Sequence, residues 1–145
     1  MKGFTWGETL IVVVVVGVLG WITWSQFELA KAKSRDVERK SDLHEISKMV
    51  KLYYKDYGKL PLANELNNFF GKTWVDKGYV YMKTVPKENY IDKPYCYKVY
   101  DNKVFGLLAD LENKYDEVCK KDLVECEGKF YCFEDKMSAE VEVIK

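Results

Sequence analysis

The sequence predicts an α+β fold in which one long N-terminal helix packs against a small C-terminal antiparallel sheet. The first observation is an apolar run without charge over residues 9–27, which is long enough for a membrane-spanning helix. The second is an apolar stripe at three- and four-residue spacing over residues 43–57, which is typical of an amphipathic helix. The third is a set of short alternating segments after residue 94, which indicates strands joined by tight turns.

Length and composition limit what the chain can be. Its 145 residues and 17.0 kDa are enough for one domain. The 23 basic residues equal the 23 acidic ones, which argues against a nucleic-acid partner, because such partners normally meet a basic excess. The sequence has one histidine, His44, which excludes any site that needs two imidazoles. It has no nucleophile elbow, phosphate-binding loop or metal triad, so we do not expect an enzyme.

Residues 4–27 form the predicted membrane span. A helix of this length measures about 36 Å, and the hydrocarbon core of a bilayer is about 30 Å thick. A cleaved signal peptide would instead begin with several basic residues and end in a small-x-small cleavage site. Only Lys2 precedes the apolar run, and Trp21, Thr23 and Trp24 stand near its end. Tryptophan is enriched at membrane interfaces, so the pattern favours a retained helix.

Glu8 stands inside this apolar stretch, close to its N-terminal end. A carboxylate costs about 2.5–3.5 kcal/mol at the bilayer centre and less near the interface. One interpretation is therefore a tolerated interfacial residue, and the other is a carboxylate that needs a positive partner. Because no Lys or Arg occurs between Lys2 and Lys31, such a partner would come from outside this helix or be a newly made N-terminal amine.

The helix is predicted to run unbroken from about Thr5 to Tyr57. Residues 28–42 are dense in mixed charge and contain neither Pro nor Gly, and we expect this middle part to be solvated or to face another subunit. The apolar residues that follow at helical spacing should form one buried stripe; they are Leu43, Ile46, Val50, Tyr53 and Tyr57. Gly58 should end the helix, because glycine readily adopts the left-handed conformation of a helix cap.

The head begins after Pro61 with a connecting region, in which we expect a short helix near residues 62–70. Residues 95–100 alternate and predict a strand, followed by a turn at Asp101-Asn102 and a hairpin partner over residues 103–108. A third strand is expected over residues 129–133 after a turn at Gly128, and a fourth over residues 139–144. Together these strands would form the small antiparallel sheet that packs on the helix stripe.

The N-terminal residues resemble a known processing signal. Lys2-Gly3-Phe4-Thr5-Trp6-Gly7-Glu8, followed by a Val-rich span with Gly17 and Gly20, is similar to the class III signal of type IV pilins, which the pseudopilins of type II secretion systems share. The resemblance continues through residues 30–36, 40–43 and 52–61. It divides the chain into a leader peptide (1–3), a transmembrane and filament-core helix (4–27), an amphipathic stem helix (28–57) and a globular head (58–145).

The resemblance implies a structural filament subunit. A membrane prepilin peptidase would cut between Gly3 and Phe4, the new Phe4 amine would be methylated, and Glu8 would be the signature acidic residue of the family. Glu8 of an incoming subunit would then pair with the Phe4 amine of a neighbour. The implied partners are other copies of the chain in a helical homopolymer, minor pilins, the prepilin peptidase, the inner-membrane assembly platform and the lipid bilayer, and no nucleic acid.

Several alternatives stay open at this point. The residues do not distinguish a type IV pilus from a type II secretion pseudopilus, or a major from a minor subunit. A different class of function is a membrane-tethered extracellular binding domain that never polymerises. Glu8 is expected to discriminate between these two classes, because a simple tether has no need of a carboxylate in its membrane helix.

Two signals for membrane orientation disagree. Five basic residues between Lys31 and Lys40 follow the span and only Lys2 precedes it, which by the positive-inside rule places the head in the cytoplasm. Four cysteines in a small head indicate an oxidising compartment, and the resemblance also implies export. We therefore expect a single-pass precursor in the cytoplasmic membrane with its head outside, and a periplasmic or extracellular filament.

The cysteines are expected to form two disulfides. No Cys-x-x-Cys pair is present and the spacings do not resemble a zinc site; the four residues are Cys96, Cys119, Cys126 and Cys132. Four cysteines allow three connectivities, and the sequence does not choose among them.

An acidic stretch offers a weak calcium candidate, since the resemblance to major pseudopilins implies that such a site is common. The candidate ligands are Asp110, Glu112, Asp116 and Glu117. Lysines interleave with them and no EF-hand spacing is present, so a solvated loop is the favoured interpretation. His44 lies beside Leu43 on the helix and is expected at the surface or facing the head, not in a catalytic site.

Overall fold

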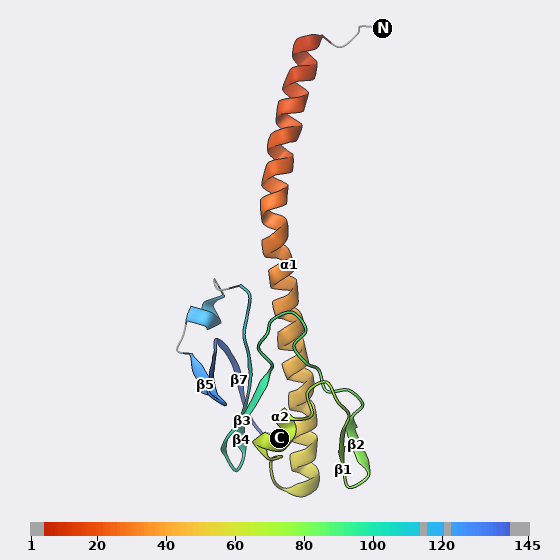
Figure 1. The fold of residues 1–145 in the computed structure, drawn as a ribbon, viewed down its shortest axis with the longest axis vertical. Helices are drawn as coiled ribbons and strands as arrows, with labels where there is room; N and C mark the ends of the chain where they lie inside the picture. The colour runs from red at the N-terminus through yellow and green to blue at the C-terminus, as the bar shows by residue number, and fades with distance from the viewer. Residues whose placement is uncertain (1–4, 114–115, 121–122, 140–145) are drawn as a thin grey trace, which may run out of the picture.

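The computed structural model describes residues 5–113, 116–120 and 123–139. One long helix, α1 (Trp6–Tyr57), carries the rest of the described chain on its C-terminal half. Figure 1 shows the N-terminal half of α1 projecting alone, with the head gathered around the other end. The predicted α+β class is confirmed, because a long N-terminal helix is combined with small antiparallel sheets.

Local sequence sets both ends of α1. Thr5 is the N-cap, and its hydroxyl oxygen accepts a hydrogen bond from the Glu8 N–H. No Gly or Pro interrupts residues 21–57. Gly58 then adopts a φ of 67° and donates its N–H to Tyr54 O at 2.7 Å. The predicted unbroken helix and its glycine cap are both confirmed.

The head consists of a three-stranded antiparallel sheet and two hairpins. The sheet has the strand order β3-β4-β7, formed by β3 (Cys96–Asp101), β4 (Val104–Ala109) and β7 (Phe133–Ser138). A short helix, α2 (Ala63–Asn67), precedes the first hairpin, which is formed by β1 (Trp74–Asp76) and β2 (Tyr79–Met82). A 3-10 turn, η1 (Glu117–Lys120), precedes the second hairpin, which is formed by β5 (Val124–Cys126) and β6 (Lys129–Tyr131).

The structure corrects the predicted strands at two places, and a third prediction lies outside the described residues. The turn of the β3–β4 hairpin is shifted by one residue, because Asp101 pairs with Val104. The expected strand over residues 129–133 is wrong, since β6 ends at Tyr131 and pairs with β5, while Phe133 begins β7 beside β4. A bend at Cys132 separates the two strands. The strand expected over residues 139–144 lies outside the described residues, apart from Ala139, which follows β7.

The predicted helix stripe forms one wall of the core. Leu43, Ile46 and Val50 are fully buried in one cluster with Phe105 and Leu107 of β4. Burying one such side chain stabilises a fold by about 1.5–3 kcal/mol. The stripe therefore holds the sheet on the C-terminal half of α1.

The β1–β2 hairpin lies in the region that the sequence predicts only as a connection. Its Trp74 and Tyr81 pack on Tyr53 of α1, with ring centroids 5.6 Å and 5.3 Å from that of Tyr53. Strands of three and four residues contain too little alternation to be recognised from sequence. The aromatic contacts, which join segments far apart in the chain, decide this part of the fold.

Candidate functional site

The N-terminal half of α1 presents an apolar surface that the head does not cover. Every residue from Thr5 to Trp24 is exposed. By length and composition α1 is able to cross a membrane, and it is the one such helix among the described residues. An apolar surface of this length is far larger than the contiguous apolar patches that soluble monomers expose.

Glu8 has polar partners within its own helix. Its Oε2 accepts hydrogen bonds from the Thr5 N–H at 2.7 Å and the Thr5 hydroxyl at 2.8 Å, and its N–H donates to the Thr5 hydroxyl oxygen at 3.4 Å. This reciprocal arrangement is a capping box. The positive end of the helix dipole also favours a carboxylate at this position. The Thr-x-x-Glu spacing before an apolar run is the sequence signal that could have indicated the cap.

The capping box changes how far Glu8 distinguishes a filament subunit from a simple membrane tether. A tether also benefits from a capped helix, so the expectation that a tether has no need of Glu8 has to be revised. Both hydrogen bonds that Thr5 donates, from its N–H and from its hydroxyl, go to Oε2, and within the described part of the chain none goes to Oε1. Gly3 and Phe4, where processing is expected, lie outside the described residues.

The second part of the site is the junction where α1 enters the head. Asp36 and Arg39 are 3% and 1% exposed, so the expectation of a solvated charged middle is wrong here. Arg39 donates to Asp36 Oδ1 at 2.7 Å, to Glu112 Oε1 at 2.7 Å and to Glu88 Oε2 at 2.6 Å. Arg35 adds a two-pronged pair with Glu112. These five residues are termed the basal ion cluster.

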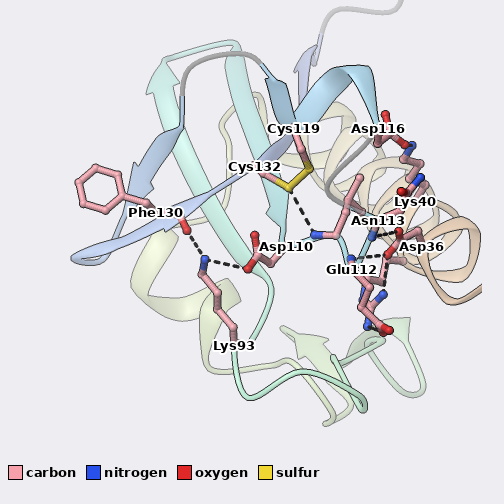
Figure 2. Close-up of a disulfide and its surroundings, with 12 residues drawn as sticks. Asp36, Lys40, Lys93, Asp110, Glu112, Asn113, Asp116, Cys119, Phe130 and Cys132 are labelled. Atoms are coloured by element: carbon pink, nitrogen blue, oxygen red, sulfur yellow. Dashed lines mark hydrogen bonds and ion pairs between the residues drawn. A yellow bond between two sulfur atoms is a disulfide. The ribbon is translucent and has the colours of Figure 1, made fainter. Parts of the chain in front are cut away.

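The basal ion cluster ties two loops of the head to α1. One loop contains Glu88, and the other contains Glu112 and Asn113. The Asp36 carboxylate accepts the N–H groups of Glu112 and Asn113, each at 2.9 Å. Figure 2 shows these bonds next to the ion pair between Lys40 and Asp116, whose Nζ and Oδ2 atoms are 2.8 Å apart. The head is therefore fixed to the helix by charge as well as by the apolar stripe.

Two carboxylates of the cluster, Glu112 and Glu88, are held in their ionised form. Hydrogen bonds from Arg35, and then from Arg39, lower the pKa of Glu112 to about 2, although desolvation acts in the opposite direction. Burial raises the pKa of Glu88, but hydrogen bonds from Arg39 and from the Tyr90 N–H outweigh burial, and the pKa is lowered overall. Both carboxylates therefore stay charged near neutral pH.

The four calcium candidates do not converge on a shared site. Asp110 Oδ2 lies 3.2 Å from Lys93 Nζ, and Asp116 pairs with Lys40 (Figure 2). Glu112 is engaged by the two arginines of the basal ion cluster, and Glu117 is exposed at the start of η1. Across the described ranges, no three acidic, histidine or cysteine side chains are grouped to hold a metal ion.

Two disulfides join the β5–β6 region to the three-stranded sheet. Cys96 in β3 is bonded to Cys126 at the end of β5, and Cys119 in η1 is bonded to Cys132 just before β7. This is one of the three connectivities that the sequence leaves open. The short β5–β6 hairpin therefore does not depend on its own few hydrogen bonds. His44 lies exposed on α1.

Comparison of the chain with protein-family models, curated proteins and solved structures finds no match. The functional argument therefore depends on the exposed half of α1, on Glu8 and on the junction with the head.

Proposed function

We propose that this chain is the structural subunit of a type IV pilus-like or type II secretion pseudopilus filament. It would be made as a membrane-inserted precursor, cleaved after Gly3 by a prepilin peptidase, and polymerised through the N-terminal half of α1. The observation that carries the proposal is an apolar helix surface, exposed from Thr5 to Trp24, with one carboxylate near its start. The resemblance of residues 2–8 to the class III signal supports it as well.

The apolar surface would have a different cover at each stage. In the precursor, lipid would cover it, and Glu8 would lie near the helix end, where a carboxylate costs least. In the filament, the same surface would pack against the helices of neighbouring copies. Minor pilins and the inner-membrane assembly platform would start and drive this transfer from lipid to filament, with the head outside the membrane.

Glu8 would have two roles in this scheme. Within its own helix it caps the first turn through Oε2. Between subunits, Oε1 would meet the Phe4 amine that cleavage creates, and such an amine is cationic near neutral pH. Leaving one partner of a buried ion pair without the other costs about 3–5 kcal/mol, so an incorrect axial register would be disfavoured.

The second candidate is a membrane-tethered extracellular binding domain that does not polymerise. The capping box supports this candidate, because it provides a reason for Glu8 that involves no other subunit. In a tether Glu8 would act only as a helix cap. The two candidates therefore differ in whether the charge of Glu8, or only its hydrogen bonding, is required.

Two matched variants separate charge from capping. Glu8→Gln removes the charge and keeps the cap, because Gln also serves at the third position of a capping box. Thr5→Ala removes the capping hydroxyl, at a cost of about 1 kcal/mol, and keeps the charge. The measurement is filament yield from sheared cells relative to the membrane-bound pool, with processing of each variant checked by intact mass.

A filament subunit should lose most of its filament yield in Glu8→Gln, while its membrane pool stays normal because removing a charge eases insertion. Thr5→Ala should retain most of the yield. The tether candidate predicts no filaments for any form. Wild-type filament yield for Glu8→Gln, with processing intact, would refute the proposed pairing of Glu8 with the Phe4 amine.

A further inference from the structure

Three tryptophans stand near the two ends of the exposed half of α1. Trp6, Trp21 and Trp24 are 85%, 82% and 83% exposed, which is more than any aliphatic side chain between them. Indole has an apolar ring and one N–H donor, so it suits a place where one side is apolar and the other is wet. Such side chains gather at membrane–water interfaces. The exposed half of α1 therefore has an interfacial residue type near each end.

The distance between the outer two tryptophans fits a lipid bilayer. From Trp6 to Trp24 the helix advances 18 residues, which is about 27 Å at a rise of 1.5 Å per residue. The hydrocarbon core of a bilayer is about 30 Å thick. A difference of a few Å is absorbed by small adjustments of the bilayer. Both tryptophans can therefore lie at an interface at the same time.

The side chains between these two levels suit hydrocarbon. Apart from tryptophan and glycine they are aliphatic, with three exceptions, which are Glu8, Thr9 and Thr23. Each threonine hydroxyl donates to a carbonyl oxygen one turn earlier, at 3.3 Å and 2.8 Å, so neither hydroxyl lacks an acceptor in lipid. Glu8 lies only two residues, about 3 Å, inside the level of the first tryptophan, so its carboxylate is within reach of the interface.

Charged side chains begin one turn beyond Trp24. Lys31 Nζ lies 3.7 Å from Glu28 Oε1 and 4.4 Å from the ring centroid of Phe27. Glu28 is about 6 Å beyond Trp24 along the helix, which corresponds to the polar headgroup region, about 5–8 Å thick on each side. Arg35, where the basal ion cluster begins, is about 17 Å beyond Trp24. The cluster therefore stands clear of the headgroups.

The tryptophans also share one side of α1. At 3.6 residues per turn, Trp6 and Trp24 are separated by about five whole turns, and Trp21 precedes Trp24 by three residues. Glu8 follows Trp6 by two residues, which places it on the opposite side of the helix. Lipid contacts of the tryptophans and any contact of Glu8 with another subunit therefore use different sides of α1.

We propose that Trp6 and Trp24 bind the two interfaces of a phospholipid bilayer and fix the depth of α1 in it. Lipid carbonyl and headgroup oxygens accept the indole N–H, and the upper acyl chains cover the ring. Hydrocarbon then surrounds residues 7–23, and the head is held clear of the headgroups. The inference rests on the membrane stage of the proposed function, which the filament and tether candidates share, and it adds the depth and side of the helix that lipid holds.

Fluorine NMR of the full chain in phosphatidylcholine nanodiscs tests this depth. 5-Fluorotryptophan replaces the four tryptophans, and Trp→Phe variants assign their signals. The lipids carry a nitroxide either at the headgroup or near the end of an acyl chain, and the relaxation enhancement of each signal measures its proximity to that label. The headgroup label should enhance Trp6 and Trp24 at least about threefold more than the chain-end label, because each lies about 14 Å from the bilayer centre. Trp74, which packs on Tyr53 in the head, should respond to neither label.

Val15→Trp is the matched control, because position 15 lies halfway between Trp6 and Trp24. Its signal should show the opposite preference, for the chain-end label. If it does, while Trp6 or Trp24 also prefers the chain-end label, the inference is overturned and the membrane stage stands. A control signal that the chain-end label does not enhance overturns both, because the helix is then not inserted. Shielding of Trp6 and Trp24 from both labels also overturns the inference, since a second copy then covers that side of α1. Filament yield does not enter the measurement, so its outcome is separate from that of the filament proposal.

Discussion

Arg39→Met should be the most damaging single substitution at the junction between α1 and the head. Methionine keeps an apolar stem but removes a guanidinium that donates to three carboxylates. Asp36 would keep two backbone N–H donors, and Glu112 would keep Arg35. Glu88, whose side chain is 2% exposed, would keep only backbone donors from residues 89–91. Glu88 and Asp36, whose side chain is 5% exposed, would both lose the cation that Arg39 provides.

The expected loss follows from these stranded charges. Removing one partner of a buried ion pair costs about 3–5 kcal/mol. The free energy of unfolding of a domain is about 5–15 kcal/mol, so this loss would remove a large share of it. In a domain of roughly 100 residues, 1 kcal/mol shifts the Tm by about 4–8 °C. The Tm of the head should therefore fall by more than about 10 °C in Arg39→Met.

Thermal unfolding of the full chain in detergent, followed by near-UV circular dichroism, measures this loss. The signal comes mainly from the packed aromatic cluster around Trp74, which unfolds with the head. Lys40→Met is the matched control, because Lys40 is 34% exposed and its contacts within the described residues are an ion pair with Asp116 and a position 5.3 Å from the ring centroid of Phe133. Such a partly exposed pair is worth less than about 1 kcal/mol.

A double variant identifies the cause. Glu88→Gln in the Arg39→Met background removes the stranded charge of Glu88, while that of Asp36 stays, and should recover part of the lost stability. Equal Tm values for Arg39→Met and Lys40→Met would refute the assignment of a buried, stabilising cation. A double variant no more stable than Arg39→Met alone would show that the stranded charge of Glu88 does not cause the loss.

Three further predictions concern the cysteines, acid and processing. In the native chain all four cysteines should resist alkylation until reduced, and peptide mapping should recover Cys96 with Cys126 and Cys119 with Cys132; four free thiols would contradict the disulfides. The pKa of Glu112 is lowered to about 2 from an ordinary 4.5, so its ionised form contributes stability above pH 4.5 that is lost as the pH falls toward 2. Burial raises the pKa of Asp42, so the titration of Asp42 changes stability with pH in the opposite direction. Acid titration of the Tm should thus show a fall that Glu112→Gln reduces, and an unchanged slope in that variant would count against the pairing with Arg35. Intact mass of the membrane form should show cleavage between Gly3 and Phe4 with one added methyl group, and Met1 or Lys2 retained in assembled material would contradict processing.

The helix could be predicted almost completely because its signals are local. The start at Thr5, the uninterrupted run to Tyr57 and the cap at Gly58 depend on residues within about one turn of each other. The buried stripe beginning at Leu43 could likewise be predicted from the sequence, because helical spacing alone places these residues on one face. The capping role of Glu8, which the sequence analysis did not recognise, also has a local signal, because Glu8 follows Thr5 by three residues.

The charged middle of α1 shows where such reasoning stops. Composition predicts that a stretch dense in Lys, Arg and Glu is exposed to solvent, and this prediction is correct for Lys33 and Glu38. It fails for Arg39 because the carboxylates that make its burial tolerable, Glu88 and Glu112, lie 49 and 73 residues further along the chain. No property of residues 28–42 by themselves indicates that two loops of the head will cover them.

By itself, the sequence determined where the helix begins and ends, which half of it is apolar and which face is buried. Only the tertiary structure decided the ion-pair partners of Arg39, the cysteine connectivity and the division of residues 129–138 between two sheets. The reason is physical: periodicity and caps act between neighbours within a turn, whereas a disulfide or a buried ion pair depends on where distant segments meet. Cys96 and Cys126, 30 residues apart, bond because β3 and β5 pack side by side.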